Sequence, residues 1–145
     1  MRILGEDKME ASGIPPKSVT TLLRLDGLAV AIATIAAYAI IGGNWWLFAL
    51  LILAPDLSFL AIALGKRAAA NTYNIVHSYT LPLALGGIGL ALSIGWMLPV
   101  ALIWGAHIGI DRAIGYGLKY PSSLDHTHLG LMGKARKAAT LANAG

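Results

Sequence analysis

Four long apolar stretches, separated by short polar or glycine-rich segments, make up most of the chain. Each stretch is close to the roughly 20 residues that a helix needs to cross the hydrocarbon core of a bilayer. The pattern therefore predicts transmembrane helices at about 21–41, 45–64, 71–92 and 97–118. Between Ala68 and Ile110 there is no Asp, Glu, Lys or Arg, so the turn between the last two helices is placed from Ser93, Gly95 and Pro99.

Polar segments flank this predicted membrane domain, which covers residues 19–120. Residues 1–18 have mixed charges and two adjacent prolines, and they lack the short apolar core of a cleaved signal peptide. We expect them to form a disordered cytoplasmic tail. Residues 121–145 are predicted to form a cytoplasmic C-terminal tail, with its last Ala- and Lys-rich part frayed.

The positive charges predict the orientation. All eleven Lys and Arg residues lie before or at the start of the first helix, between the second and third, or at and after the end of the fourth. With four crossings they all fall on one side, which is cytoplasmic by the positive-inside rule. The predicted fold is therefore all-α, a four-transmembrane-helix bundle in the inner (plasma) membrane with both termini cytoplasmic.

Composition excludes an ordinary water-soluble domain. Only 12% of the residues are charged and 57% are hydrophobic, whereas soluble domains have about 25% charged residues. The net charge of +4 on such an apolar chain favours an anionic membrane surface over nucleic acid. Membrane lipid is the expected partner, nucleic acid is not, and a homo-oligomer is left open. The absence of cysteine excludes disulfides and cysteine-based catalysis or metal binding.

Five ionisable side chains nevertheless lie within the apolar stretches. On a rise of about 1.5 Å per residue they lie roughly 9–16 Å from the cytoplasmic helix ends, in the same half of the bilayer. An isolated acid in the middle of a bilayer costs about 3 kcal/mol. We therefore expect one polar cluster inside the bundle, with contributions from all four helices: Asp26, Asp56, His77, His107 and Asp111.

Residue spacing in the fourth helix supports this cluster. His107 and Asp111 are four positions apart, so both side chains project from one helical face. Gly105 and Gly109 form a small-xxx-small pair, which predicts close approach of another helix beside His107.

Polar residues and prolines also alternate in the second and third stretches. Asn74, His77 and Ser78 follow helical spacing and predict a polar stripe. Pro55 immediately precedes an aspartate and Pro82 follows Ser78 by one turn, so both positions predict kinks beside polar groups.

Two histidines and three carboxylates form a donor set suited to zinc, manganese or iron. A carboxylate beside such a divalent metal could act as general base. Each polar group alone also has a structural explanation: His107 and Asp111 as a hydrogen-bonded pair, Asp26 paired with Arg24 or at a helix start, and His77 as an interhelical hydrogen bonder.

The chain resembles a bacterial membrane family, domain of unknown function 4260, between Leu22 and Gly130. The resemblance is carried by short motifs: Leu-Leu-Arg-Leu-Asp-Gly at 22–27, Ala-Pro-Asp-Leu-Ser at 54–58, Tyr-Asn-Ile-Val-His-Ser-Tyr at 73–79, His-Ile-Gly-Ile-Asp-Arg at 107–112, Gly-Tyr-Gly-Leu-Lys-Tyr at 115–120 and Thr-His-Leu-Gly at 127–130. It implies a membrane protein but no biochemical function.

A more distant similarity is to the LexA-regulated inner-membrane metal-dependent hydrolases, which share the order Pro-Asp, His-Ser and His-x-x-x-Asp along the helices. It implies metal ligands, or their immediate partners, at Asp56, His77, His107 and Asp111. Ser58, Phe59 and Thr72 stand where that family has further acidic or histidine residues. These departures argue against a two-metal site.

The leading hypothesis is a metal-dependent hydrolase of lipid-like substrates, with its site near the cytoplasmic face. Asp26, as fifth ligand or general base, and Asp111 are the expected catalytic carboxylates. Further residues are expected to orient ligands or substrate (Asn74, Ser78, Tyr116), to hold an anionic head group (Arg112, Lys119) or to close the site from below (His128). The alternatives are a small transporter or proton- or ion-conducting bundle, and a structural membrane module. For the segment around His128, a solvated loop is the alternative.

Overall fold

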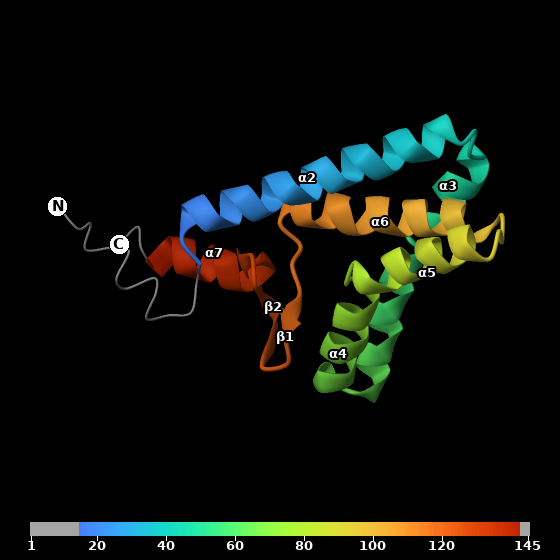
Figure 1. Ribbon diagram of the computed structural model, residues 1–145. Helices are drawn as coiled ribbons and strands as arrows, with labels where there is room; N and C mark the ends of the chain where they lie inside the picture. The colour runs from blue at the N-terminus through green and yellow to red at the C-terminus, as the bar shows by residue number, and fades with distance from the viewer. Residues whose placement is uncertain (1–14, 143–145) are drawn as a thin grey trace.

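The structure, a computed structural model, describes residues 15–142 and consists mostly of helices joined by short turns (Figure 1). The N-terminal half contains α2 (Lys17–Ile40), α3 (Trp45–Leu51), the 3-10 helix η1 (Ala54–Leu64) and α4 (Lys66–Val76). The C-terminal half contains α5 (Thr80–Ala91), α6 (Met97–Ile114), the strands β1 (Lys119–Tyr120), β2 (Ser123–Thr127) and β3 (Gly130–Leu131), and α7 (Gly133–Ala142).

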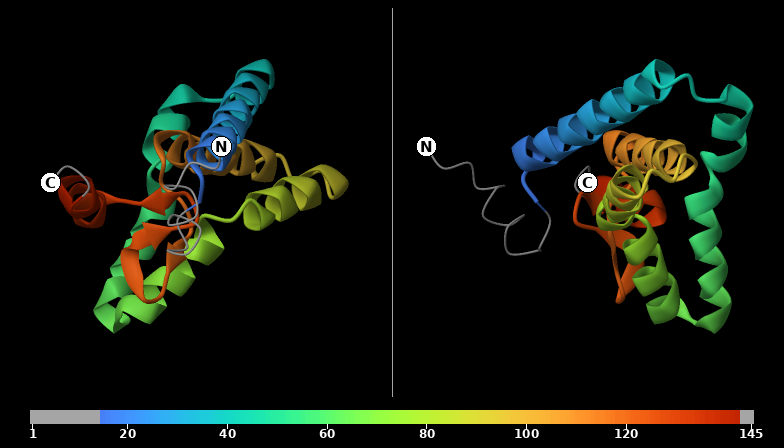
Figure 2. Two further views of the ribbon diagram at one scale, coloured as in Figure 1. Left: turned by 90° about the vertical axis from the view of Figure 1, so that its left-hand side faces the viewer. Right: turned by 45° about the vertical axis from the view of Figure 1, so that its right-hand side comes forward.

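Helices α2 and α6 form the long central pair, and they lie side by side in every view (Figures 1 and 2). The two backbones approach closely because glycines face each other. A Cβ atom on Gly109 would lie 2.7 Å from the Ala31 amide nitrogen, and one on Gly27 would lie 3.0 Å from the Gly109 carbonyl oxygen. The close approach predicted from Gly105 and Gly109 is confirmed, and α2 is the helix that makes it.

The second apolar stretch is interrupted near Pro55, as predicted. Helix α3 ends at Leu51 and η1 begins at Ala54. Proline has no amide hydrogen to donate, so regular α-helical hydrogen bonding cannot continue through this position. The stretch 45–64 is still apolar and long enough to cross a membrane.

The third stretch is not the single helix predicted at 71–92. It is divided into α4 and α5, with a break at residues 77–79. Pro82 lies in the first turn of α5, where a missing amide hydrogen is tolerated. The Ser78 hydroxyl oxygen accepts a hydrogen bond from the Thr80 amide at the same point. With 12 residues, α5 is roughly 18 Å long, too short to cross a bilayer alone.

The four predicted crossings are therefore not confirmed. Among the described residues, three segments are long and apolar enough to span a membrane: α2, the run from Trp45 to Leu64, and α6. Helix α4 packs against η1, and this pair projects away from the α2–α6 pair (Figure 1).

The chain ends differ from the predicted tails. Residues 1–14 of the predicted disordered tail lie outside the described residues, and α2 already begins at Lys17. The fourth helix ends at Ile114 instead of about 118, because Gly115 adopts φ of 103° as its left-handed cap. Residues 121–142 of the predicted C-terminal tail contain β2, β3 and α7. Strand β2 lies between β3 and β1 in an antiparallel sheet, and β1 falls at the end of the predicted membrane domain. The all-α prediction therefore missed a small sheet.

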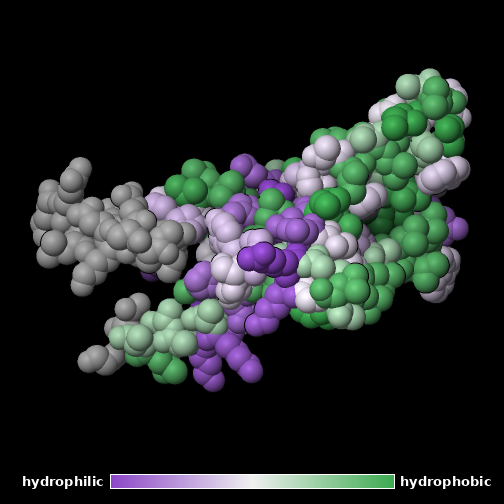
Figure 3. Space-filling model, turned by 90° about the horizontal axis from the view of Figure 1, so that it is seen from below, coloured by the Kyte–Doolittle hydropathy of each residue, from purple (hydrophilic) through white to green (hydrophobic). Residues whose placement is uncertain are grey.

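Large apolar side chains are exposed along the helices, as a lipid-facing surface requires. Trp46 is 85% exposed, Leu64 82% and Leu83 73%. Seen from below, hydrophobic residues gather at one end of the molecule and hydrophilic ones in its middle (Figure 3). Large contiguous apolar surfaces are rare on soluble monomers, so this surface supports a membrane location.

Candidate metal centre

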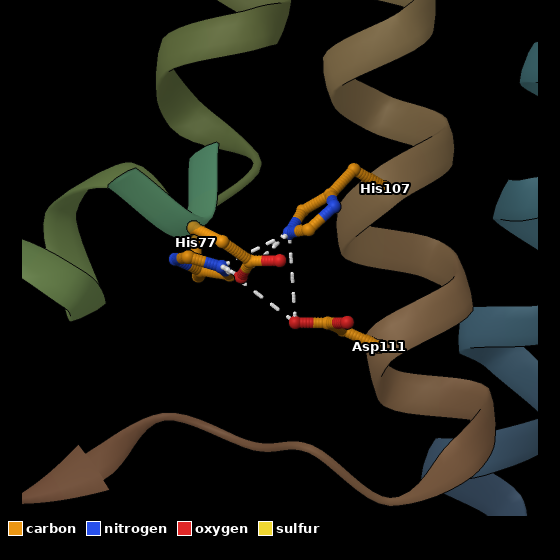
Figure 4. A group of neighbouring side chains, drawn as sticks. His77, His107 and Asp111 are labelled. Atoms are coloured by element: carbon orange, nitrogen blue, oxygen red, sulfur yellow. Dashed lines mark hydrogen bonds and ion pairs between the residues drawn. The ribbon is translucent and has the colours of Figure 1, made fainter. Parts of the chain in front are cut away.

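Four side chains from three separate parts of the chain converge at one point: Asp56 in η1, His77 at the end of α4, and His107 and Asp111 in α6. One ligand atom from each lies within 4.8 Å of all the others. Figure 4 shows His77 and His107 pointing toward one another, with Asp111 one helical turn below His107. The predicted cluster thus forms from four of its five expected members.

Local structure explains how each side chain reaches this point. His107 and Asp111 share one face of α6 because they are four residues apart. His77 follows the last turn of α4, where the chain breaks before α5. Asp56 comes directly after Pro55, in the first turn of η1.

Five of the six distances between these ligand atoms lie close to those of a tetrahedral ion site. The Nε2 atoms of His77 and His107 are 3.1 Å apart. Each of them lies 3.5 Å from Asp56 Oδ1 and 3.6 Å from Asp111 Oδ2. An ion about 2.0–2.2 Å from four tetrahedral ligands sets neighbouring ligand atoms about 3.3–3.6 Å apart. The four residues could therefore hold one metal ion.

A backbone hydrogen bond sets the His77 ring so that it can bind a cation. His77 Nδ1 lies 3.0 Å from the Tyr73 carbonyl oxygen. A carbonyl can only accept, so Nδ1 carries the hydrogen and donates it, and the lone pair of the neutral ring lies on Nε2. This lone pair faces the other three ligand atoms. Hydrogen bonding of the remote ring nitrogen is the usual support for a metal-binding histidine.

Tyr73 supports the cluster in two further ways, and its role was missed in the sequence. Its hydroxyl donates to Asp111 Oδ2 at 3.3 Å, and its ring stacks on His77 at a centroid distance of 3.7 Å. The available signal was its spacing of four residues from His77 on one helix. Tyr73 is 2% exposed, so these contacts are held inside the protein.

Charge and burial also favour a bound cation. Two carboxylates and two neutral imidazoles give the cluster a formal charge of −2 when no proton or ion is bound. The side chains of His77 and His107 are 3% and 4% exposed and that of Asp111 is 17% exposed, whereas that of Asp56 is 47% exposed. Buried charge needs compensation, and a divalent ion would neutralise the group. Asp56 marks the side on which the cluster is open.

The family of the chain is shown by a match over most of its length. The family model Domain of unknown function (DUF4260) matches residues 20–132. The chain belongs to this family. No curated protein and no solved structure matches this DUF4260 chain. The hydrolase resemblance stays a prediction.

Asp26 is the expected member that this DUF4260 structure leaves outside the cluster. It lies on α2 and is exposed, and it is not part of the four-residue group. Its neighbour Gly27 is the residue that faces α6. A role for Asp26 as fifth ligand or base would need a conformation other than the one described.

Two other predicted residues stabilise the backbone near the cluster. The Asn74 amide donates to the Lys119 carbonyl at 2.8 Å and accepts from the Lys119 amide at 2.7 Å, which fixes β1 to α4. The Ser78 hydroxyl bonds with Thr80 at the start of α5. Both therefore hold the segments that position His77.

The cations predicted to hold a head group have other contacts. The Arg112 guanidinium packs over the Tyr79 ring at 4.6 Å. Lys119 is 6% exposed, and its Nζ donates to the Leu124 carbonyl and lies 4.8 Å from the centre of the Tyr73 ring. Burial lowers the pKa of Lys119, while the nearby carboxylates oppose that shift. Tyr116 is exposed beyond the end of α6.

His128 folds back toward the end of α6 and is not part of a solvated loop. Its Nδ1 accepts a hydrogen bond of 2.8 Å from the Leu118 amide, and its own amide donates to the Leu118 carbonyl. Burial, reinforced by the charge of Arg112, lowers the pKa of His128. His128 thus fixes the segment between α6 and the sheet, and it is not one of the four clustered residues.

Proposed function

We propose that this integral membrane protein binds one zinc ion through Asp56, His77, His107 and Asp111 and hydrolyses a lipid-like ester or phosphoester. The observation that carries the proposal is the convergence of four ligand atoms within 4.8 Å of one another, one of them set by the hydrogen bond from His77 to Tyr73. Two imidazole nitrogens beside two carboxylate oxygens favour zinc over manganese, which prefers octahedral oxygen sites.

The two carboxylates have different environments and therefore different roles. Asp111 is held by the Tyr73 hydroxyl and largely buried, so it is the anchoring ligand. Asp56 is half exposed, and among the described residues its ion-pair partners are the two histidines. It is the group that can move aside for substrate and accept a proton from water. A bound divalent ion supplies Lewis-acid polarisation and acidifies water.

An apolar cavity beside the cluster supports a lipid-like substrate. Its volume is about 240 Å³, and its walls include Pro55, Val76, Ile103 and Trp104. Pro55 and Val76 directly precede two of the ligands, and Ile103 lies one turn before His107. The Trp104 indole donates to the Val76 carbonyl at 2.8 Å, which fixes this wall. An aliphatic chain in the cavity would bring the adjoining polar bond to the cluster.

A proton- or ion-conducting bundle is the second candidate, and the direct contact of His77 with His107 favours it. Ionisable residues inside a membrane domain often form proton relays. A relay needs no bound metal, so metal content separates the two functions.

The first test is the metal content of the detergent-purified protein, measured by mass spectrometry for zinc, manganese and iron. We expect about one zinc per chain in the wild type and its loss in H107A and D111N. H126A, at an exposed histidine of β2, is the matched control and should retain the metal. Equal zinc content in H107A and H126A contradicts the site.

The second test addresses hydrolysis itself. Wild type and H107A are incubated with zinc and with mixed phospholipid vesicles, and lipid products are followed by mass spectrometry. Product formation by the wild type alone supports a hydrolase. Zinc binding without any product contradicts hydrolysis of these lipids but leaves the metal site standing. Proton flux into liposomes that D56N abolishes, in protein without metal, supports the relay instead.

A further inference from the structure

A second cavity lies at the opposite end of α2 from the α2–α3 turn, between the start of α2, the end of α6 and the segment that leads into α7. Its volume is about 520 Å³, and none of the four clustered residues lines it. Its walls come from segments more than 80 positions apart in the chain, so the fold creates it.

Three cations surround this cavity: Lys17 and Arg24 from the first turns of α2, and Arg136 from the first turn of α7. Among the residues that the structure describes, its lining contains no aspartate or glutamate. The nearby Asp125 lies beside Gly133, where a Cβ would be 3.5 Å from its Oδ1, and its charge acts on Lys119. The described part of the cavity lining therefore has an excess of positive charge.

The Arg24 side chain is held at the edge of this cavity by one hydrogen bond to α6. Its Nε donates to the Ala113 carbonyl at 2.8 Å, which satisfies one of the unpaired carbonyls at the end of α6. Among the described residues the two terminal nitrogens of the guanidinium have no hydrogen-bond partner, and paired donors suit the oxygens of a phosphate. Tyr116 also lines this cavity.

The N-termini of α2 and α7, which carry a partial positive charge, also lie at the cavity. Among described residues, neither α2 nor α7 has an acidic residue in its first turn, and α2 has no side-chain cap. The starts of both helices line the cavity, and the amides of a helix N-terminus favour anions. The partial positive charge of the two helix N-termini adds to the larger charge of the three cations.

We propose that this cavity binds a phosphate group, as found in the head group of an anionic phospholipid or in a soluble phosphate. It is distinct from the metal centre and does not depend on it. The sequence predicted that Arg112 and Lys119 hold an anionic head group, but their charged groups pack against aromatic rings. We assign this role to the cavity instead.

The test measures binding of dioctanoyl phosphatidylglycerol and dioctanoyl phosphatidylcholine to the full chain in dodecyl maltoside. We expect the wild type to prefer the anionic lipid by tenfold or more. R24Q and R136Q should each weaken its binding about fivefold. K66Q and K137Q remove the same charge at exposed positions outside the cavity and should change binding less than twofold. If R24Q does not fold, K17Q replaces it and should likewise weaken binding of the anionic lipid.

Competition with inorganic phosphate identifies the source of the phosphate. Displacement of the lipid by millimolar phosphate assigns a site open to soluble phosphate, whereas no displacement assigns a lipid head group. The proposal is overturned if the two lipids bind equally, or if K66Q weakens binding as much as R24Q and R136Q do. Zinc content should be unchanged in all these variants, so failure here is separate from failure of the metal site.

Discussion

Tyr73 is the residue whose hydroxyl can be tested apart from its ring. Y73F removes the hydrogen bond to Asp111 and keeps the stacking on His77. Loss of such a supporting hydrogen bond typically weakens metal binding 10–100-fold. We expect zinc affinity to fall about tenfold, measured by competition with a chelating dye at constant pH.

Tyr79 provides the matched control for this substitution. Its hydroxyl is buried and has no hydrogen-bond partner among the described residues. Y79F should therefore leave zinc affinity unchanged and cost little or no stability, because no hydrogen bond is lost. Equal effects of Y73F and Y79F would show that the Tyr73 hydroxyl does not support Asp111.

At the residue scale, sequence analysis found the four clustered side chains but placed Asp26 with them wrongly. Asp26 was included because its expected distance from the cytoplasmic helix end is similar to that of the other four residues. This distance does not show in which direction a side chain points. Successive residues of a helix are turned by about 100°. Gly27 faces α6 and Asp26, next to it, is exposed. Only the packing of α2 on α6 shows which residue points inward.

At the scale of elements, the α2–α6 contact depends on glycine. G109A would put a Cβ 2.7 Å from the Ala31 amide nitrogen and 2.8 Å from the Gly27 carbonyl oxygen, so the two helices would have to separate. Such overpacking costs about 1–3 kcal/mol. We expect a lower midpoint of thermal unfolding in detergent and, because His107 lies two residues away on the same helix, weaker zinc binding.

The control for this contact is G87A on α5, where a Cβ would meet nothing within 4 Å. Alanine favours a helix over glycine by about 1 kcal/mol. G87A should therefore keep or raise the unfolding midpoint. A G109A protein as stable as G87A would show that close backbone approach does not hold α2 to α6.

The segment from α6 to the sheet should be sensitive to acid because of His128. Burial lowers the pKa of His128 below its ordinary value of 6.5 in the folded protein. Above pH 6.5 the ring is neutral in both states and the folded segment has its full stability. As the pH falls below 6.5, the unfolded segment takes up a proton more readily, so stability is lost.

Hydrogen exchange at pH 7.5 and 5.5, corrected for intrinsic rates, measures this effect. Protection of residues 118–131 should fall at pH 5.5 relative to α6. H128N keeps an acceptor near the Nδ1 position and does not titrate, so the loss should be smaller in this variant. H126A, at an exposed position, should behave as the wild type. An unchanged pH response in H128N would contradict the role of His128.

One break in an element was predicted from a single proline, whereas two other boundaries were missed. The proline after residue 54 interrupts the second stretch, as expected. Gly115 ends α6 earlier than hydrophobicity suggested, and the break at 77–79 divides the third stretch. Hydropathy alone runs through both points. The sheet was missed because its strands are two to five residues long and polar, and they are held by partners such as Asn74.

At the scale of the whole molecule, hydropathy is segregated along the α2–α6 pair (Figures 1 and 3). The α2–α3 and α5–α6 turns lie at one end of this pair, and the sheet and α7 lie toward the other. The apolar side chains gather at the former end, whereas α7 contributes three cations at the latter. Three described segments are long and apolar enough to span a membrane, so the number of crossings and the orientation stay predictions.

Single cysteines can test this orientation, because the chain contains none. I41C and W96C place a thiol near the α2–α3 and α5–α6 turns, whereas K66C and K137C place one at the η1–α4 turn and on α7. If the cations lie on the cytoplasmic side, a membrane-impermeant maleimide added to intact cells should label I41C and W96C. It should label K66C and K137C only after the membrane is opened.

All four positions are exposed in the structure, so differences in labelling report the membrane and not burial. Labelling of K137C together with W96C in intact cells would place α7 and the α5–α6 turn on one side. In that case α6 would not cross, and the metal centre on it would lie at a membrane surface. Labelling of K66C alone among the cationic positions would instead show that η1 and α4 project outward, which would separate Asp56 from the cytoplasmic leaflet.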